Sequence, residues 1–247
     1  MGTIPYWRPT GPILLALFLF APPAVADVDD DFRAQVEERV QQLISSAERI
    51  DITASPVDGL FEVTVDGRVL YITDDARHVF AGNLMDMEER RNLTEAAEDR
   101  ARAATIETMD EENMIVFRAP EERHVVTVFT DTECPYCRRM HQQMDAYHER
   151  GITIRYLAFP REGQGSRGWN NLAAIWCADD PNAAMDRGMN GGSIGSERCD
   201  DNPVEEHFNL AGAMGVRGTP SIITEGGTML PGFVPPSNLL EALEEGR

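Results

Sequence analysis

The sequence predicts an α+β protein made of two folded units joined by a helix. Three observations support this class. The first third of the chain has one helical pattern followed by short strand patterns. The second half places a Cys-x-x-Cys pair between a strand pattern and a helix pattern, with another strand after the helix. A run rich in Ala, Glu and Arg separates the two regions, and such a run is typical of a solvent-exposed helix.

Residues 1–26 predict an export signal that is removed from the mature protein. Arg8 supplies a positive charge, residues 13–21 form a short apolar run, and Ala24-Val25-Ala26 matches an A-x-A cleavage site. A membrane-spanning helix needs about 20 apolar residues, so this run is too short to be an anchor. We therefore expect an exported protein whose mature chain begins at Asp27.

The chain is strongly acidic, with a formal net charge of −20. This charge argues against nucleic acid as a partner, because binding to phosphates requires a basic surface. All 22 basic residues are arginine. One explanation is a GC-rich genome. Another is a salty habitat, where salt screens the self-repulsion of an acidic surface.

Residues 27–88 are predicted to form a small N-terminal domain. Apolar residues recur at helical spacing from Asp30 to Ile50, and Asp66-Gly67 then gives a strong hairpin-turn signal. The predicted strands are Leu60–Val65, Val69–Ile72 and His78–Phe80. A domain of this size is only marginally stable alone, and its sheet edges favour pairing with another chain. We therefore interpret the segment as a dimerisation domain.

Residues 89–112 are predicted to contain a linker helix. Asn92 and Glu95 have the spacing of a capping box, and few apolar residues follow them. The run is either a solvated surface helix or a rigid spacer, and about 18 helical residues would span about 27 Å. We favour the spacer, because the run separates two distinct patterns.

Residues 113–247 are predicted to form the catalytic domain. Its opening order is strand, CPYC, helix, strand, which begins a thioredoxin-like fold. The expected elements are two strands around an Ala119-Pro120 turn (Met114–Phe117, His124–Thr130), a helix (Arg138–Arg150), a strand (Ile152–Leu157), a helical insertion (Trp169–Met214), two strands (Ser221–Thr224, Met229-Leu230) and a final helix (Asn238–Glu245).

Cys134 and Cys137 have the positions of a redox pair. Cys134 lies at a strand-to-helix junction, where unpaired backbone N–H groups stabilise a thiolate and lower its pKa. Pro135 suits the first helical position. Cys137 lies one turn further along, so we expect it to be more buried and to have a higher pKa. These positions predict an exposed attacking thiolate at Cys134 and a resolving thiol at Cys137.

Two other interpretations of the CPYC pair are less favoured. Zinc sites usually combine one such pair with a second pair or with spaced histidines, and the remaining cysteines are 22 residues apart. We therefore expect no metal and no other cofactor. A structural disulfide across so small a loop would add little stability.

Two ionisable residues lie close in sequence to the CPYC pair. Glu133 should raise the pKa of Cys134, and we expect Arg138 and Arg139 to offset its charge. His141 is expected to be a solvated helix residue rather than a proton carrier.

Cys177 and Cys199 have different surroundings. Cys177 lies in the apolar run AAIWC, and Cys199 lies in a polar loop. In an exported protein such a pair favours a structural disulfide, for which chain entropy predicts about 3.4 kcal/mol of stabilisation. The alternative is a buried free cysteine and an unrelated exposed one.

Taken together, these segments resemble the DsbC type of periplasmic thiol:disulfide interchange protein, in the DsbC/DsbG family. The resemblance covers nearly the whole mature chain in order. It rests on VLYITDDARHVFAG, MIVFRAPEERHVVTVFTDTECPYC, GITIRYLAFPREG, AAIWCADD, GVRGTP and LPGFVPP.

The resemblance implies a V-shaped periplasmic homodimer with a cystatin-like dimerisation domain, a linker helix and a thioredoxin-like catalytic domain. It implies that Cys134 is the nucleophile, Cys137 its partner, and Cys177–Cys199 a structural disulfide. The implied substrate-binding residues are Tyr136, Thr219 and a cis Pro220. The implied partners are misfolded disulfide-containing exported proteins and a membrane reductase of the DsbD type.

The expected function is therefore protein disulfide isomerisation by a reduced CPYC pair. The family's best-known members have Gly-Tyr between the cysteines and often His after them, whereas this chain has Pro-Tyr and Arg138. These differences leave the redox potential open. The alternatives are a DsbG-like reductase or oxidase with a more oxidising centre, and a non-enzymatic chaperone.

Overall fold

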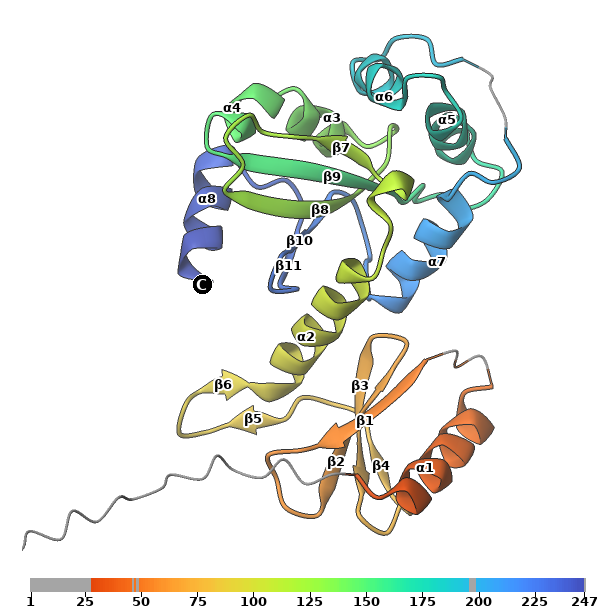
Figure 1. Ribbon diagram of the computed structural model, residues 1–247, viewed down its shortest axis with the longest axis vertical. Helices are drawn as coiled ribbons and strands as arrows, with labels where there is room; N and C mark the ends of the chain where they lie inside the picture. The colour runs from red at the N-terminus through yellow and green to blue at the C-terminus, as the bar shows by residue number, and fades with distance from the viewer. Residues whose placement is uncertain (1–27, 46, 48, 196–198, 247) are drawn as a thin grey trace, which may run out of the picture.

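The computed structural model describes residues 28–45, 47, 49–195 and 199–246 of the 247-residue chain. The predicted export signal, residues 1–26, lies outside these described residues. Two folded units lie at opposite ends of helix α2, Leu93–Glu107 (Figure 1). Within the described ranges, the structure contains no helix that is both long and apolar enough to cross a membrane.

The N-terminal unit is an antiparallel sheet covered by one helix. The helix is α1 (Asp30–Leu43), and the sheet has the order β1 (Ile50–Ala54), β2 (Leu60–Val65), β3 (Arg68–Thr73) and β4 (Val79–Phe80). The Asp29 side chain caps α1 by accepting two backbone N–H bonds. Val36 and Val40 of α1 are buried in the same cluster as Ile52 and Val63 of the sheet.

The prediction of a helix from Asp30 to Ile50 is wrong in its last third. The helix ends at Leu43, and Ile50 begins strand β1. The physical reason is the two-residue alternation after the helix. Ile52 is buried while Asp51 and Thr53 on either side are exposed, as expected for a strand that has one face on the core.

A short hairpin leads into helix α2. It consists of β5 (Met85–Asp86) and β6 (Arg91–Asn92), which sequence patterns did not predict. Asn92 is the N-cap of α2, and its Oδ1 accepts the N–H of Glu95 at 3.2 Å, at the predicted capping position.

Helix α2 packs against both units. The hydroxyl groups of Thr94 and Tyr71 of β3 lie 2.8 Å apart in the interior. Near the other end, the buried Arg102 donates from Nε to the carbonyl oxygen of Gly227 at 2.9 Å. A Cβ at Gly227, whose φ is +85°, would lie 1.8 Å from the carbonyl oxygen of Asp99. A glycine is therefore required for the helix to approach this turn so closely.

The C-terminal unit is built on a sheet of order β11-β10-β8-β9-β7. Its strands are β7 (Ile115–Phe117), β8 (His124–Thr130), β9 (Ile152–Ala158), β10 (Ser221–Thr224) and β11 (Met229–Pro231). β8 and β9 are parallel, and the other pairs are antiparallel. β7 pairs with β9 rather than with β8, its neighbour in sequence.

Helices cover the sheet (Figure 1). After the short η1 (Glu111–Asn113) and β7, they are α3 (Pro135–His141), α4 (Met144–His148), α5 (Arg167–Trp176), α6 (Pro181–Met189), α7 (Val204–Ala213) and α8 (Pro236–Glu245). The single helix expected over Arg138–Arg150 is split into α3 and α4, because Gln143 (φ −106°, ψ 19°) leaves the helical range. Alternate residues of β8 face two cores. Val126 and Val128 pack in the cluster that contains the CPYC cysteines, and Phe129 packs with Ala211 of α7.

Candidate active site

The CPYC cysteines lie where strand β8 is followed by helix α3. Cys134 is the N-cap residue of α3, with φ −87° and ψ 119°, and Pro135 begins the helix. The carbonyl of Asp131 accepts the N–H of Cys134 at 3.0 Å, which fixes the turn between strand and helix. Cys134 and Cys137 are both reduced.

Cys134 is not the exposed thiol that the sequence predicts, because only 1% of the residue is accessible to solvent. The loop before β10 covers it, and in the protonated state its Sγ donates to the carbonyl oxygen of Thr219 at 3.2 Å. The pKa of Cys134 is nevertheless lowered to about 5. The largest cause is a hydrogen bond from the Cys137 thiol, with smaller contributions from the nearby Thr219 side chain and from the N–H groups of Cys137 and Tyr136, while burial opposes them.

Cys137 has the opposite electrostatic character. Burial raises its pKa well above the ordinary value, and the neighbouring Cys134 raises it further by hydrogen bonding and by charge. At neutral pH the pair therefore consists of one thiolate and one thiol. A thiolate with a protonated neighbour has the chemistry required to attack a disulfide and then to release the product.

The three residues predicted to bind substrate surround the pair in different ways. Tyr136 is 59% exposed, although it stands directly between two buried cysteines. The peptide bond from Thr219 to Pro220 is cis, and the Thr219 carbonyl contacts Cys134. Pro220 is buried, and its carbonyl accepts the N–H of Gly232 at 2.8 Å. A client chain can therefore reach Tyr136 without movement of the protein.

Two charged residues that sequence reasoning missed organise the loop before Cys134. Asp131 is 2% exposed, and its carboxylate accepts the N–H of Glu133 at 2.9 Å and the Nε–H of Arg161 at 2.9 Å. The positive charge of Arg161 also interacts with Cys134 and Cys137. The signal in the sequence was an acidic residue directly after the apolar strand that leads to CPYC.

Glu133 is neutralised by two arginines. Its carboxylate forms ion pairs with Arg138, at 3.6 Å, and with Arg167 of α5. The predicted contribution of Arg139 is wrong, because its guanidinium lies 4.8 Å above the ring of Phe233 instead. The negative charge beside Cys134 is therefore balanced from α3 and from the helical insertion.

His141 is not a solvated helix residue, as the sequence suggested, but is 4% exposed. Its Nε2 lies 2.7 Å from Oδ1 of Asp186 on α6, and its Nδ1 lies 3.2 Å from the Tyr156 hydroxyl. Burial lowers its pKa, against the opposing effect of Asp186. The histidine thus links α3 to the helical insertion and to β9.

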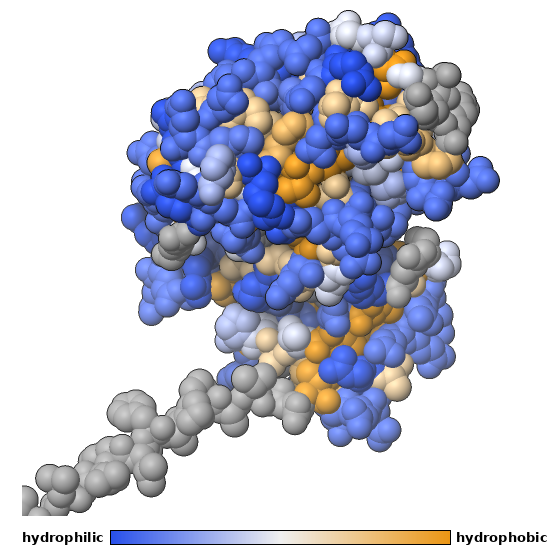
Figure 2. Space-filling view, turned by 45° about the horizontal axis from the view of Figure 1, so that its top comes forward, coloured by the Kyte–Doolittle hydropathy of each residue, from blue (hydrophilic) through white to orange (hydrophobic). Residues whose placement is uncertain are grey.

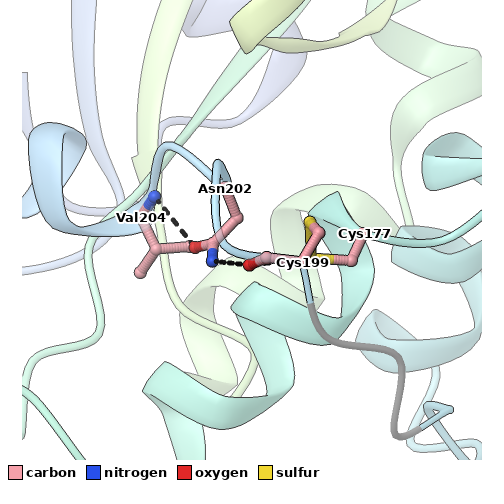
Figure 3. Close-up of a disulfide and its surroundings, with 4 residues drawn as sticks. All are labelled: Cys177, Cys199, Asn202 and Val204. Atoms are coloured by element: carbon pink, nitrogen blue, oxygen red, sulfur yellow. Dashed lines mark hydrogen bonds between the residues drawn. A yellow bond between two sulfur atoms is a disulfide. The ribbon is translucent and has the colours of Figure 1, made fainter.

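Cys177 and Cys199 form a disulfide with an S–S distance of 2.01 Å and a Cα–Cα distance of 5.6 Å (Figure 3). Cys177 is the C-cap residue of α5. The carbonyl of Cys199 accepts a bond from Nδ2 of Asn202 at 2.9 Å, and Oδ1 of Asn202 accepts the N–H of Val204 at 3.4 Å (Figure 3). The disulfide therefore joins the end of α5 to the turn that begins α7.

In the described part of the chain, no group of three or more His, Cys, Asp or Glu side chains is arranged to hold a metal ion.

Comparison with protein families gives two matches that together span most of the chain. Residues 22–95 match the family described as "Disulfide bond isomerase protein N-terminal domain". Residues 110–247 match the family described as "Thioredoxin-like domain".

Several curated proteins are similar over most of their length. The thiol:disulfide interchange protein DsbC of Escherichia coli K12 is 41% identical over 197 residues, which are 79% of this chain and 81% of the relative. The DsbC protein of Dickeya dadantii is 37% identical over 235 residues, which are 94% of each chain. Among solved structures, the catalytic domain of Proteus mirabilis ScsC aligns with a TM-score of 0.50 and 21% identity. It covers 59% of this chain and 97% of that domain, and it supports the fold alone.

Proposed function

The chain belongs to the DsbC family of thiol:disulfide interchange proteins, and from this premise we propose how its residues carry out disulfide exchange. Family membership confirms the predicted α+β class, with a thioredoxin-like domain behind an N-terminal domain of the DsbC type. It also makes the chain a thiol:disulfide exchange enzyme of the disulfide isomerase kind.

Cys134 is the nucleophile in this proposal, and its lowered pKa is the observation that carries it. The Cys134 thiolate attacks one sulfur of a client disulfide, forms a mixed disulfide and releases the other client sulfur as a thiolate. A second client thiolate can then attack the same client sulfur, which makes a new client disulfide and returns Cys134 as a thiolate. This cycle reshuffles the client with no net oxidation or reduction.

Cys137 supplies a second exit from the mixed disulfide. Its thiol is held beside Cys134 and remains protonated, so it does not compete with Cys134 for the first attack on the client disulfide. Tyr136, Thr219 and Pro220 are the proposed client-binding residues. An exposed ring at Tyr136 and the Thr219 carbonyl beside Cys134 support this assignment.

Refolding of a scrambled multi-disulfide protein tests the proposal. The reduced enzyme should restore native client disulfides faster than the Cys134→Ser variant, which keeps the fold but lacks the nucleophile. An equal rate for the two proteins would refute isomerase action through Cys134. The alternative of a DsbG-like reductase or oxidase is not favoured, because the similar curated proteins are of the DsbC type.

The family's N-terminal domain supports a homodimer. We propose that two copies meet along strand β4, at the edge of the N-terminal sheet. Val79 and Phe80 on this strand are 49% and 53% exposed, and Leu43 at the end of α1 is 71% exposed. A groove of about 330 Å³ runs between these elements. In the view of Figure 2, apolar surface lies on the N-terminal unit and also on the C-terminal unit, amid a mostly hydrophilic surface.

A charged residue on the proposed edge tests this interface. Phe80→Asp should shift the protein from dimer to monomer in sedimentation, because it places a charge in a desolvated contact. Met87→Asp, in the exposed turn after β5, is the matched control and should stay dimeric. A dimeric Phe80→Asp protein would place the interface elsewhere.

We further propose that the chain works in the periplasm after cleavage behind Ala26, and that a membrane reductase of the DsbD type keeps the pair reduced. The apolar N-terminal segment and the exchange chemistry support these points. N-terminal sequencing of the exported protein tests the cleavage site. Alkylation of Cys134 in cells with and without such a reductase tests the donor, and an unchanged reduced fraction would contradict it.

A further inference from the structure

Thr130, the last residue of β8, carries a hydroxyl that the fold leaves unsatisfied. The residue has no solvent exposure, and its Oγ1 has no hydrogen-bond partner among the described residues. A buried hydroxyl without a partner destabilises the folded state, and valine would fill the same space without that penalty. The retention of a hydroxyl at this position therefore requires a reason.

The position of Thr130 supplies one. Side chains alternate along a strand, so Thr130 lies on the same face of β8 as Val126 and Val128. That face packs in the cluster that contains Cys134 and Cys137. A second buried hydroxyl without a partner, that of Thr219, belongs to the loop that covers Cys134. Although neither hydroxyl makes a hydrogen bond of ordinary geometry within the described residues, each lies near enough to the Cys137 sulfur to lower its pKa, against the burial that raises it.

We propose that the Thr130 hydroxyl is the donor that stabilises the Cys137 thiolate when a client is released from the mixed disulfide. This inference rests on the proposed function of Cys137 and adds the group that makes its reaction possible. In the resting pair Cys137 is a thiol, so the hydroxyl has no anion to bind. The thiolate that forms during release is buried, and a donor that is already in place costs no reorganisation.

The release step balances without an external oxidant, with water as the proton acceptor. Cys137 loses its proton to water, and its thiolate attacks Sγ of Cys134. The Cys134–Cys137 bond forms, and the bond from Cys134 to the client sulfur breaks. The client sulfur leaves as a thiolate and takes up a proton from water. The cysteine pair is oxidised by two electrons, and the client disulfide is reduced by the same two electrons.

Other charged or titratable groups also face Cys137. They are Cys134 at the N-cap of α3, Tyr156 on β9, and Arg161 after β9. A substitution at Thr130 changes none of these groups, so its effect on the pH dependence of release reports the hydroxyl alone.

Single-turnover release of glutathione tests the proposal. The mixed disulfide between Cys134 and glutathione is prepared, and the rate of glutathione release is measured from pH 6 to pH 10. Thr130→Val should slow release about tenfold at pH 7 and move the rate profile about one pH unit higher, which is the effect of losing one hydrogen bond to the thiolate. Thr130→Ser keeps the hydroxyl and should release within about twofold of the wild-type rate.

Two controls separate chemistry from packing. Thr127→Val changes a buried threonine of the same strand whose side chain lies on the opposite face, and its release rate should be unchanged. In denaturant, Thr130→Val should be at least as stable as the wild type, because it removes an unsatisfied hydroxyl. If Thr130→Val does not fold, Thr130→Ala replaces it and must show the same defect.

Each result decides between distinct conclusions. An unchanged profile for Thr130→Val would overturn the proposal, and equal slowing by Thr130→Ser would assign the effect to packing and also overturn it. Failure of the proposed function is separate: it would appear as wild-type release no faster than that of Cys137→Ser.

Discussion

The two cysteine pairs of the catalytic domain differ in the helix end that one of their members caps. Cys134 is the N-cap of α3, whereas Cys177 is the C-cap of α5. A helix N-terminus presents N–H groups that stabilise a thiolate, and a helix C-terminus presents carbonyl groups that disfavour one. The first pair is thus favoured as a thiolate and a thiol, and the second as a closed disulfide.

Loop length strengthens the same contrast. A disulfide across CPYC closes a loop of only a few residues, so its formation removes little entropy from the unfolded chain. The Cys177–Cys199 disulfide spans 22 residues, and the same entropy argument gives it about 3.4 kcal/mol. The lesson is that equal solvent exposure does not give the two cysteines equal reactivity. Cys134 is as buried as Cys137, and its helix position and hydrogen bonds set its chemistry.

The largest expected effect comes from the first pair. Cys137→Ser removes the resolving thiol but leaves the attack by Cys134, so the variant should accumulate mixed disulfides with its clients. Non-reducing gels of exported protein measure this accumulation. Replacement of Cys177 and Cys199 by Ser should give no such adducts, and adducts in that variant would break the contrast between the pairs.

Stability should depend on the second pair. The double variant Cys177→Ser, Cys199→Ser should lose about 3 kcal/mol of unfolding free energy, because its unfolded chain regains the entropy of the open loop. Urea denaturation of the oxidised and variant proteins measures the difference. The absorbance titration of Cys134 should stay unchanged, since the disulfide joins α5 to the turn before α7 rather than to α3. A stability loss below about 1 kcal/mol would contradict the entropy argument.

The two pairs should also differ in pH dependence. The folded pKa of Cys134, about 5, is below its ordinary value of 9.0, so the unfolded chain binds more protons between these values. Stability of the reduced protein should therefore rise from pH 5 to pH 8, by at most about 1.4 kcal/mol per pH unit. In the opposite direction, this stabilisation is lost as the pH falls through 5. Cys137 titrates above this window.

Absorbance at 240 nm and urea unfolding at several pH values measure these two quantities. Cys134→Ser should remove the thiolate signal and flatten the corresponding part of the stability curve. The closed Cys177–Cys199 disulfide does not titrate, so its removal should leave the shape of the curve unchanged.

The smallest expected effect concerns Pro135. Its ring fixes the first residue of α3, so Pro135→Gly should loosen the N–H groups that stabilise the Cys134 thiolate. The reduced pair should then be less stable relative to the disulfide, and the potential should become more negative by on the order of 30 mV. Equilibration with glutathione measures it, and a shift in the oxidising direction would contradict this account.

Much of the fold follows from local pattern. The order of strands and helices around CPYC, the capping box at Asn92 and the hairpin turn at Asp66-Gly67 were all predicted, because periodicity and turn chemistry depend on near neighbours in sequence. Pairing of distant strands was not. β7 lies on β9 rather than on its sequence neighbour β8, and strand β1 was not predicted, because its first residue, Ile50, was assigned to the preceding helix.

For the site, the sequence by itself determined which residues we propose for disulfide exchange. The spacing of Cys134 and Cys137 at a helix start, and the contrast with Cys177 and Cys199, follow from residues close together in the chain. Only the tertiary structure decided how that chemistry is tuned. The Thr219 loop buries Cys134, Asp131 holds Arg161 beside the sulfurs, and the unsatisfied hydroxyl of Thr130 faces Cys137. The physical reason is range: helix ends and spacing act over one turn of chain, whereas burial and electrostatics depend on segments brought together from far apart.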